Sequence, residues 1–291
     1  MIDNIYLEQV LENDAVHYNH VEVERQLEED RPRVNDFFCG AGGMGLGFKQ
    51  AGFDVVGAWD VDRYAVATYK ENVGSYVLQK DITEMTYLDI PYAEVWTFGF
   101  PCQDLSYAGR RVGLIEGKRS SLFFEVMRLL DETIENQPEN LPYILLAENV
   151  KGLKTYLSVL EEEFGKRGYS MYAELFNSKY WGVPQNRERY FVVGVNHVIE
   201  DDFTFPEQMI NNIPNLSSIL EPYVDEKYYI DDQKAKTVLT QAMEKGNLRY
   251  VHATATPDRI EKRQNGRRSK SNEEVMFTLT TQDIHGVILH A

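Results

Sequence analysis

Strand-like and helix-like segments alternate from Arg33 to about Gly194, and this order constrains the fold more than any other feature of the chain. Short apolar segments rich in β-branched and aromatic residues are typical of strands. We expect seven of them, the last two as a closing pair: Val34–Phe38, Val55–Trp59, Tyr76–Gln79, Val95–Phe98, Tyr143–Ala147, Met171–Asn177 and Tyr190–Val195. We expect helices at Met44–Ala51, Tyr64–Asn72 and Ser121–Ile134. This alternation predicts an α/β fold with a mostly parallel, doubly wound sheet covered on both faces.

The sequence divides into three regions. Residues 1–33 carry nine acidic and three basic residues, and we expect an acidic, helical N-terminal extension that ends at Pro32. Residues 34–196 are expected to form the α/β domain. Residues 197–291 are polar, with weak periodicity, and are expected to form a separate C-terminal region.

The charge of the chain is strongly acidic, with 46 Asp and Glu against 30 Lys and Arg and a net charge of −16. Nucleic-acid affinity depends largely on basic side chains that neutralise phosphates, so this balance is unusual for a domain that binds DNA by itself. Basic residues are concentrated in residues 245–270, which hold eight of them and two acids. That run is either a solvated loop or a contact for an anionic partner.

The two cysteines, Cys39 and Cys102, are too few for a disulfide framework. The sequence has no apolar run of about 18 residues and no N-terminal secretory pattern, so we expect neither a membrane span nor a signal peptide. These features predict a cytoplasmic location with reducing conditions.

Polar residues follow three successive predicted strands, at the edge where ligands of open α/β sheets bind. The first strand leads into a glycine loop, Phe38–Gly43, whose backbone N–H groups could approach an anion or a cofactor. The second ends at Asp60 and Asp62, where an acid can bind ribose hydroxyls, and the third at Asp81-Ile82, which suits an adenine ring. Glycines also occur in dinucleotide enzymes and tight turns, and single acids are often helix caps. The succession of three acids favours a cofactor site.

The fourth strand leads into Gly99-Phe100-Pro101-Cys102-Gln103, and the fifth into Glu148-Asn149-Val150. A lone cysteine is usually a small buried residue. Cys102 lies on a loop at the ligand edge, next to a proline that stiffens the backbone. A thiol has a pKa near 8.5, so its attack at neutral pH needs activation. The Glu148 carboxylate is expected to lie beside this cysteine at the same edge of the sheet.

These segments resemble the signature blocks of the DNA (cytosine-5) methyltransferases, in the order and with the spacing of that family. The blocks are Phe38-Cys39-Gly40-Ala41-Gly42-Gly43, Gly99-Phe100-Pro101-Cys102-Gln103-Asp104-Leu105-Ser106, Glu148-Asn149-Val150 and Gln185-Asn186-Arg187-Glu188-Arg189. The resemblance covers about residues 34 to 194. It implies the sheet of S-adenosylmethionine-dependent methyltransferases, methyl transfer to C5 of cytosine in duplex DNA, and a role in DNA methylation such as restriction-modification. The location implied is that of a bacterial or phage enzyme acting at the nucleoid.

The resemblance also implies a mechanism. The Cys102 thiolate would add to C6 of a cytosine that has been flipped out of the duplex, because C6 is inaccessible in stacked DNA. Glu148 would hold the exocyclic amino group and N3 of the base, Arg189 would bind O2, and Arg187 would support the same pocket or the phosphates. The residues implied to contact the substrate are Phe100, Pro101, Gln103 and Asn149.

For S-adenosylmethionine, and its product S-adenosylhomocysteine, the resemblance implies eleven contact residues and no metal. They are Phe38, Gly40, Ala41, Gly42, Gly43, Asp60, Val61, Asp81, Ile82, Pro101 and Leu122. Two of them depart from the family pattern, since Asp60 stands where Glu is more common and Val61 where some members have an aromatic ring. Cys39 lies where the family tolerates several small residues, and we interpret it as structural.

The C-terminal region resembles the family only in part. Residues 276–287 are similar to the segment that leads into the target-recognition region, and the later family blocks are not found before Ala291. We therefore expect residues 197–291 to be an incomplete target-recognition region and the enzyme to be split or truncated, with a second polypeptide carrying the later blocks. Two alternatives stay open: an RNA cytosine-5 methyltransferase, against which the Pro-Cys-Gln context argues, and an inactive DNA-binding relic, against which the intact Cys102, Glu148 and Arg189 argue.

Overall fold

A computed structural model describes residues 31–101, 122–199, 202–207, 213, 215–231, 233–236, 240, 252–255, 275 and 285–288. The chain divides into two compact units. Unit 1 is formed by Met1–Pro101 and Ser121–Leu146, and unit 2 by Cys102–Ser120 and Ala147–Ala291. The expected N-terminal helix lies outside the described residues, and the two boundaries expected between the three regions stay a prediction.

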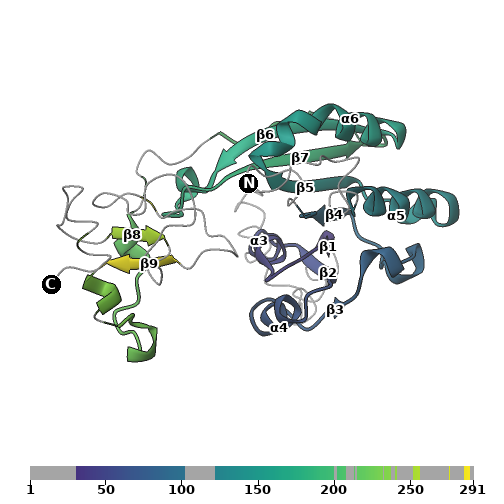
Figure 1. Ribbon diagram of the computed structural model, residues 1–291. Helices are drawn as coiled ribbons and strands as arrows, with labels where there is room; N and C mark the ends of the chain where they lie inside the picture. The colour runs from purple at the N-terminus through teal and green to yellow at the C-terminus, as the bar shows by residue number, and fades with distance from the viewer. Residues whose placement is uncertain are drawn as a thin grey trace, which may run out of the picture. The chain divides into compact units, whose positions relative to one another are not determined.

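Seven strands form one sheet in the order β3-β2-β1-β4-β5-β7-β6 (Figure 1). The strands are β1 (Arg33–Phe37), β2 (Asp54–Asp60), β3 (Val77–Gln79), β4 (Val95–Phe98), β5 (Ile144–Val150), β6 (Tyr169–Asn177) and β7 (Glu188–Asn196). In unit 1, β1 pairs in parallel with β2 and β4, and β2 pairs in parallel with β3. In unit 2, β6 and β7 pair antiparallel. The mostly parallel α/β sheet predicted from the sequence is confirmed.

In the part of the chain that the structure describes, four α-helices of at least eight residues and several short 3-10 helices lie between these strands or after β7. The α-helices are α3 (Gly43–Gln50), α4 (Arg63–Asn72), α5 (Leu122–Asn136) and α6 (Leu157–Lys166). The 3-10 helices are η1 (Ile82–Glu84), η2 (Tyr87–Asp89), η3 (Pro138–Asn140), η4 (Lys151–Tyr156), η5 (Ser178–Trp181), η6 (Leu216–Ile219) and η7 (Glu226–Tyr228). A separate antiparallel pair, β8 (His252–Ala255) and β9 (His285–Ile288), lies in the C-terminal region.

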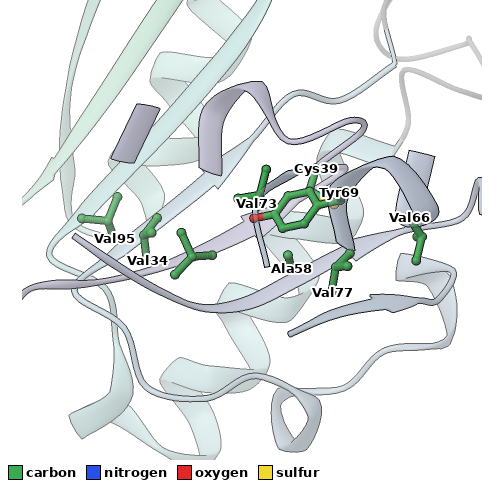
Figure 2. Close-up of a cluster of buried hydrophobic side chains, with 9 residues drawn as sticks. Val34, Cys39, Ala58, Val66, Tyr69, Val73, Val77 and Val95 are labelled. Atoms are coloured by element: carbon green, nitrogen blue, oxygen red, sulfur yellow. The ribbon is translucent and has the colours of Figure 1, made fainter. Parts of the chain in front are cut away.

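The central strands of unit 1 are buried along most of their length. All four residues of β4 are buried, as expected for a parallel strand with both faces covered. The valines of β1, β2, β3 and β4 pack against Val66, Tyr69 and Val73 of the α4 segment, which carries its apolar residues at helical spacing (Figure 2). This cluster lies directly behind the loop that follows β1, because Cys39 belongs to it. The loop is therefore fixed to the core at its second residue.

Three features of the fold differ from the sequence-based expectations. Strand β5 continues to Val150, so Glu148 lies within the strand and not after it, because burial alternates along β5 and leaves a polar residue room at every second position. Helix α6 and the β8–β9 pair were not predicted. Among the described helices, none is long and apolar enough to cross a membrane.

Candidate functional site

The first group of candidate residues is the glycine loop of unit 1, residues 38–43 between β1 and α3. Phe38 and Gly40 both have φ of 54° and Gly42 has φ of 97°, all in the left-handed region. Gly42 is the N-cap of α3 and offers no side chain to the first turn of the helix. A Cβ on Gly43 would meet no heavy atom within 4 Å. The N–H groups of Cys39, Gly40 and Gly42 are bonded within the protein, and the loop leaves open space at Gly43, where the helix begins and a cofactor could approach its N-terminus.

Asp60, at the end of β2, connects this loop to the neighbouring strand. Its Oδ2 accepts a hydrogen bond from the Gly40 N–H at 2.8 Å, and its Oδ1 accepts one from the Asp62 N–H at 2.8 Å. Asp62 itself caps α4 by accepting from the N–H groups of Tyr64 and Ala65. Of the two acids expected at this strand end, Asp60 thus touches the glycine loop and Asp62 is a helix cap.

The residues expected near an adenine ring differ in accessibility. Val61 exposes 63% of its surface, whereas Ile82 exposes only 6% and packs in the core. Asp81 caps η1, since its Oδ1 accepts from the N–H and the hydroxyl of Thr83. In this structure Val61 therefore offers an apolar contact surface, and Ile82 offers little.

The Phe100 ring, expected to contact the base, lies in an aromatic cluster with Phe98 and Phe123, at centroid distances of 6.4 and 5.5 Å. Pro101 is half-buried after it, and Leu122 begins α5. Cys102 and Gln103 lie outside the described residues.

The second group is the acid–arginine cluster of unit 2, formed by Glu148, Arg187 and Arg189. Glu148 Oε1 lies 3.0 Å from Arg189 Nε and 3.3 Å from Arg187 Nη2. The side chains of Glu148 and Arg189 are mostly buried, whereas that of Arg187 is 36% exposed. Two charged donors on one carboxylate oxygen orient it strongly. The structure thus brings together three of the four residues expected to be catalytic.

Asn149, the neighbour of Glu148, points the other way. It is buried, and its side-chain oxygen accepts from the N–H of Val150 at 2.8 Å. It therefore fixes the end of β5, where Glu148 is held.

Two polar residues near these groups were missed in the sequence. Asp36 in β1 is 1% exposed, and burial raises its pKa to about 7, with a further contribution from the negative charge of Asp60. The sequence feature that could have indicated this burial is an acidic residue within the predicted strand Val34–Phe38. Asn177, at the end of β6, accepts a hydrogen bond from the backbone N–H of Arg187. The sequence offered only an asparagine at the end of a predicted strand.

Cys39 is buried in the core, which agrees with its structural interpretation. Burial raises the pKa of its thiol, and the nearby Asp36 and Asp60 raise it further. A thiol in this setting stays protonated and is a poor nucleophile.

The amino-acid sequence of the chain is similar to those of known proteins. The family model described as C-5 cytosine-specific DNA methylase matches residues 33–284. The type II methyltransferase M.NlaX of Neisseria lactamica is 40% identical over 209 residues, which cover 69% of this chain and 63% of that protein. The orphan methyltransferase M.SPBetaI of Bacillus phage SPbeta is 27% identical over an alignment of 376 residues, covering 88% of this chain and 83% of that protein. The match to M.NlaX thus spans less than two thirds of that protein's length.

Solved structures show the same fold. The Dnmt2 methyltransferase of S. pombe superposes with a TM-score of 0.58 at 21% identity, covering 72% of this chain and 66% of that one. A putative DNA modification methyltransferase from an E. coli prophage superposes with a TM-score of 0.53 at 25% identity, covering 69% and 58%. With the family model matching most of its length, the chain belongs to the C-5 cytosine-specific DNA methylase family.

Proposed function

We propose that this chain carries the catalytic residues of an enzyme that methylates C5 of cytosine in duplex DNA, with S-adenosylmethionine as methyl donor. The observation that supports this most is the acid–arginine cluster, in which Arg189 and Arg187 both hold one oxygen of Glu148. A carboxylate beside a guanidinium presents an acceptor next to donors. That pattern matches the amino group and the O2 of a cytosine base.

In this proposal, Glu148 accepts from the exocyclic amino group of the base and supports protonation at N3, while Arg189 donates to O2. Both contacts draw electrons away from C6. The Cys102 thiolate then adds to C6, forming an S–C bond and leaving electron density at C5, which takes the methyl group. Loss of the C5 proton and departure of the thiolate restore the aromatic base. The target must leave the stacked duplex for these contacts to form.

The glycine loop fits the proposed methyl donor. Its open approach at Gly43, the exposed Val61 and the Asp60 carboxylate offer backbone donors, an apolar surface and an acceptor for hydroxyl groups. When bound, S-adenosylmethionine supplies an electrophilic methyl group on a sulfonium. Phe38, Gly40, Ala41, Gly42, Gly43, Asp60, Val61, Asp81, Pro101 and Leu122 remain the proposed contacts, and Ile82 would contribute mainly through its backbone.

The test is covalent trapping on duplex DNA that contains 5-fluorocytosine, because fluorine cannot leave C5 as a proton does. The wild-type chain with S-adenosylmethionine, reconstituted with a candidate partner where one is needed, should form a complex that survives denaturation, and Cys102→Ala should form none under the same conditions. Cys39→Ala is the matched control, since it removes the other cysteine and should leave trapping intact. The proposal would be contradicted if Cys102→Ala still formed the complex, or if Cys39→Ala lost it while Cys102→Ala kept it.

The second polypeptide expected from the sequence stays a prediction. The same trapping assay addresses it when the purified chain is tested alone and with a candidate partner on mixed-sequence duplex DNA. Competition by tRNA in that assay separates the RNA alternative, and measured binding of S-adenosylmethionine separates the inactive relic.

A further inference from the structure

Asn177 lies at the junction between β6 and the segment that carries the arginines. Its side-chain Oδ1 accepts from the N–H of Arg187 at 3.1 Å and from the N–H of Lys179 at 3.3 Å. Its Nδ2 donates to Oδ1 of Asn186 at 2.8 Å. The residue is 9% exposed, so these bonds form with little competition from water.

The neighbouring Ser178 holds the same stretch of backbone from its other side. The Ser178 N–H donates to the carbonyl of Arg187 at 3.1 Å, and its hydroxyl donates to the carbonyl of Gln185 at 2.8 Å. Asn177 and Ser178 therefore bind both the N–H and the carbonyl of Arg187. Its backbone is fixed before β7 begins at Glu188.

This fixation is needed because the connection from β6 to β7 is long. Ten residues, 178–187, separate the two strands, whereas hairpin loops usually have two to five. Strand pairing alone does not set the conformation of a connection of that length. Arg187 is its last residue, so a shift in the connection displaces the Arg187 guanidinium from Glu148 directly. Arg189 is the second residue of β7 and is paired with Phe176, so the same shift reaches the Arg189 guanidinium through the first pair of the strands, Asn177 with Glu188.

We propose that Asn177 is a positioning residue, which places the guanidinium groups of Arg187 and Arg189 on Glu148 through its hydrogen bonds to the backbone of the connection. The inference rests on the proposed function for its effect on catalysis. Its effect on geometry does not depend on that function. Asn177 itself contacts neither of the proposed reactants.

The other end of the same hairpin offers a matched control. Asn196 pairs with Tyr169 where Asn177 pairs with Glu188, and it is 7% exposed. Its Oδ1 also accepts a backbone N–H, that of Val198, at 3.0 Å. Asn177→Ala and Asn196→Ala thus remove the same group from similar surroundings in one hairpin, but only Asn177 binds the arginine segment.

The experiment compares Asn177→Ala, Asn177→Asp and Asn196→Ala by two readouts. The first is the rate of trapping on 5-fluorocytosine DNA, with S-adenosylmethionine affinity measured separately by calorimetry. Asn177→Ala should slow trapping by about 10- to 100-fold, the scale of a displaced catalytic group, with cofactor affinity unchanged. Asn196→Ala should stay within about twofold of wild type, since it lies away from the arginines.

The second readout needs no activity. In NMR spectra the Arg189 Nε–H, held at 3.0 Å from Glu148, should give a protected signal in the wild type and Asn196→Ala, and lose that protection in Asn177→Ala. Asn177→Asp keeps an oxygen acceptor for both backbone N–H groups, so it should retain the signal and most of the rate. It also carries the test if Asn177→Ala does not fold.

The proposal is overturned if Asn177→Ala matches Asn196→Ala in both readouts, or if a folded Asn177→Asp loses the Arg189 signal. A wild-type chain that fails to trap DNA would instead count against the proposed function, while the NMR comparison would still decide the role of Asn177.

Discussion

The glycine loop of unit 1 and the acid–arginine cluster of unit 2 reach a defined geometry in opposite ways. The loop is defined by its backbone, with left-handed conformations at Phe38, Gly40 and Gly42 and one carboxylate, Asp60, that accepts N–H groups. The cluster is defined by side chains, because two guanidinium groups meet one carboxylate oxygen. We therefore expect the geometry of the glycine loop to be disturbed by added side-chain atoms and by buried charge. We expect the geometry of the acid–arginine cluster to be disturbed by the loss of one of its charged side chains.

The largest effect that this comparison predicts is a pH dependence from Asp36, which is buried behind the glycine loop. Its pKa is about 7 in the folded chain and 3.8 when unperturbed. At a pH between these two values the carboxyl is therefore protonated in the folded chain and ionised in the unfolded chain. Stability from this group is therefore complete below about pH 4 and falls as the pH rises to about 7. At 1.36 kcal/mol per unit, the loss is about 4 kcal/mol. Urea unfolding from pH 4 to 8 should show it in the wild type relative to Asp36→Asn.

Asp89 in the same unit is the control with the opposite sign. A hydrogen bond from Lys80, at 2.6 Å, and one from the Thr86 N–H lower its pKa. Its contribution is thus present above the ordinary carboxyl pKa and is lost as the pH falls through the lowered value. Asp89→Asn should destabilise at pH 7 and have no effect at low pH. A wild-type to Asp36→Asn difference that does not change with pH would contradict the buried-charge account.

The second prediction compares Gly42→Ala with Gly43→Ala, neighbours in the loop. A Cβ on Gly42 would lie 2.4 Å from Cγ2 of Val73, and its φ of 97° is strained for alanine. The combined strain and overpacking should lower the free energy of unfolding by about 3 kcal/mol. Gly43→Ala meets nothing within 4 Å and should change stability by less than about 1 kcal/mol, while blocking the approach of a cofactor. Urea unfolding and calorimetry with S-adenosylmethionine separate the two, and equal stabilities would show that the loop adapts.

The sequence predicted these two regions unequally. The positions of the glycine loop and of the acids near it could be predicted because glycine and aspartate have local conformational preferences at strand ends. The burial of Asp36 could not be read, since it depends on α4 covering the loop from residues about 30 positions away. Likewise, Glu148 and the two arginines were expected to be catalytic, but their direct pairing depends on strands β5 and β7 being neighbours, which no local pattern encodes.

Strand and helix boundaries show the same limit. Helix α6 carries Leu157, Leu160 and Phe164 at helical spacing, but the six residues of the 3-10 helix η4 come directly before it and blur the periodic pattern at its start. Strand β5 was expected to end at Ala147, whereas it continues through Glu148 to Val150. The ion pairs of Glu148 with Arg187 and Arg189, which allow a carboxylate there, are visible only in three dimensions.

A third prediction concerns Asp60, whose carboxylate holds Gly40. Asp60→Ala should weaken S-adenosylmethionine binding by about 1–3 kcal/mol, because it removes an acceptor for the ligand and also releases the loop. Asp62→Ala is the control, since it removes the cap of α4 and should lower stability by about 1 kcal/mol with little change in cofactor affinity. Calorimetry that finds the same affinity for Asp60→Ala and the wild type would reject a role for Asp60 in cofactor binding.

The smallest effect is expected from Lys151→Ala, which tests whether every charge pair near the cluster matters. Lys151 Nζ lies 3.1 Å from Oε1 of Glu188, and Glu188 stands between Arg187 and Arg189 in the sequence. The side chains of Lys151 and Glu188 are 53% and 41% exposed. Water screens such a pair, so its removal should change the free energy of unfolding by no more than about 0.5 kcal/mol and leave the trapping rate unchanged. Glu148 differs because its partners are more buried and both bind the same oxygen. Urea unfolding and the trapping assay measure both quantities. A fall of more than about 1 kcal/mol in the free energy of unfolding, or a clear fall in the trapping rate, would mean that the exposed ion pair also stabilises the arginine positions. The acid–arginine cluster would then have to include Lys151 and Glu188.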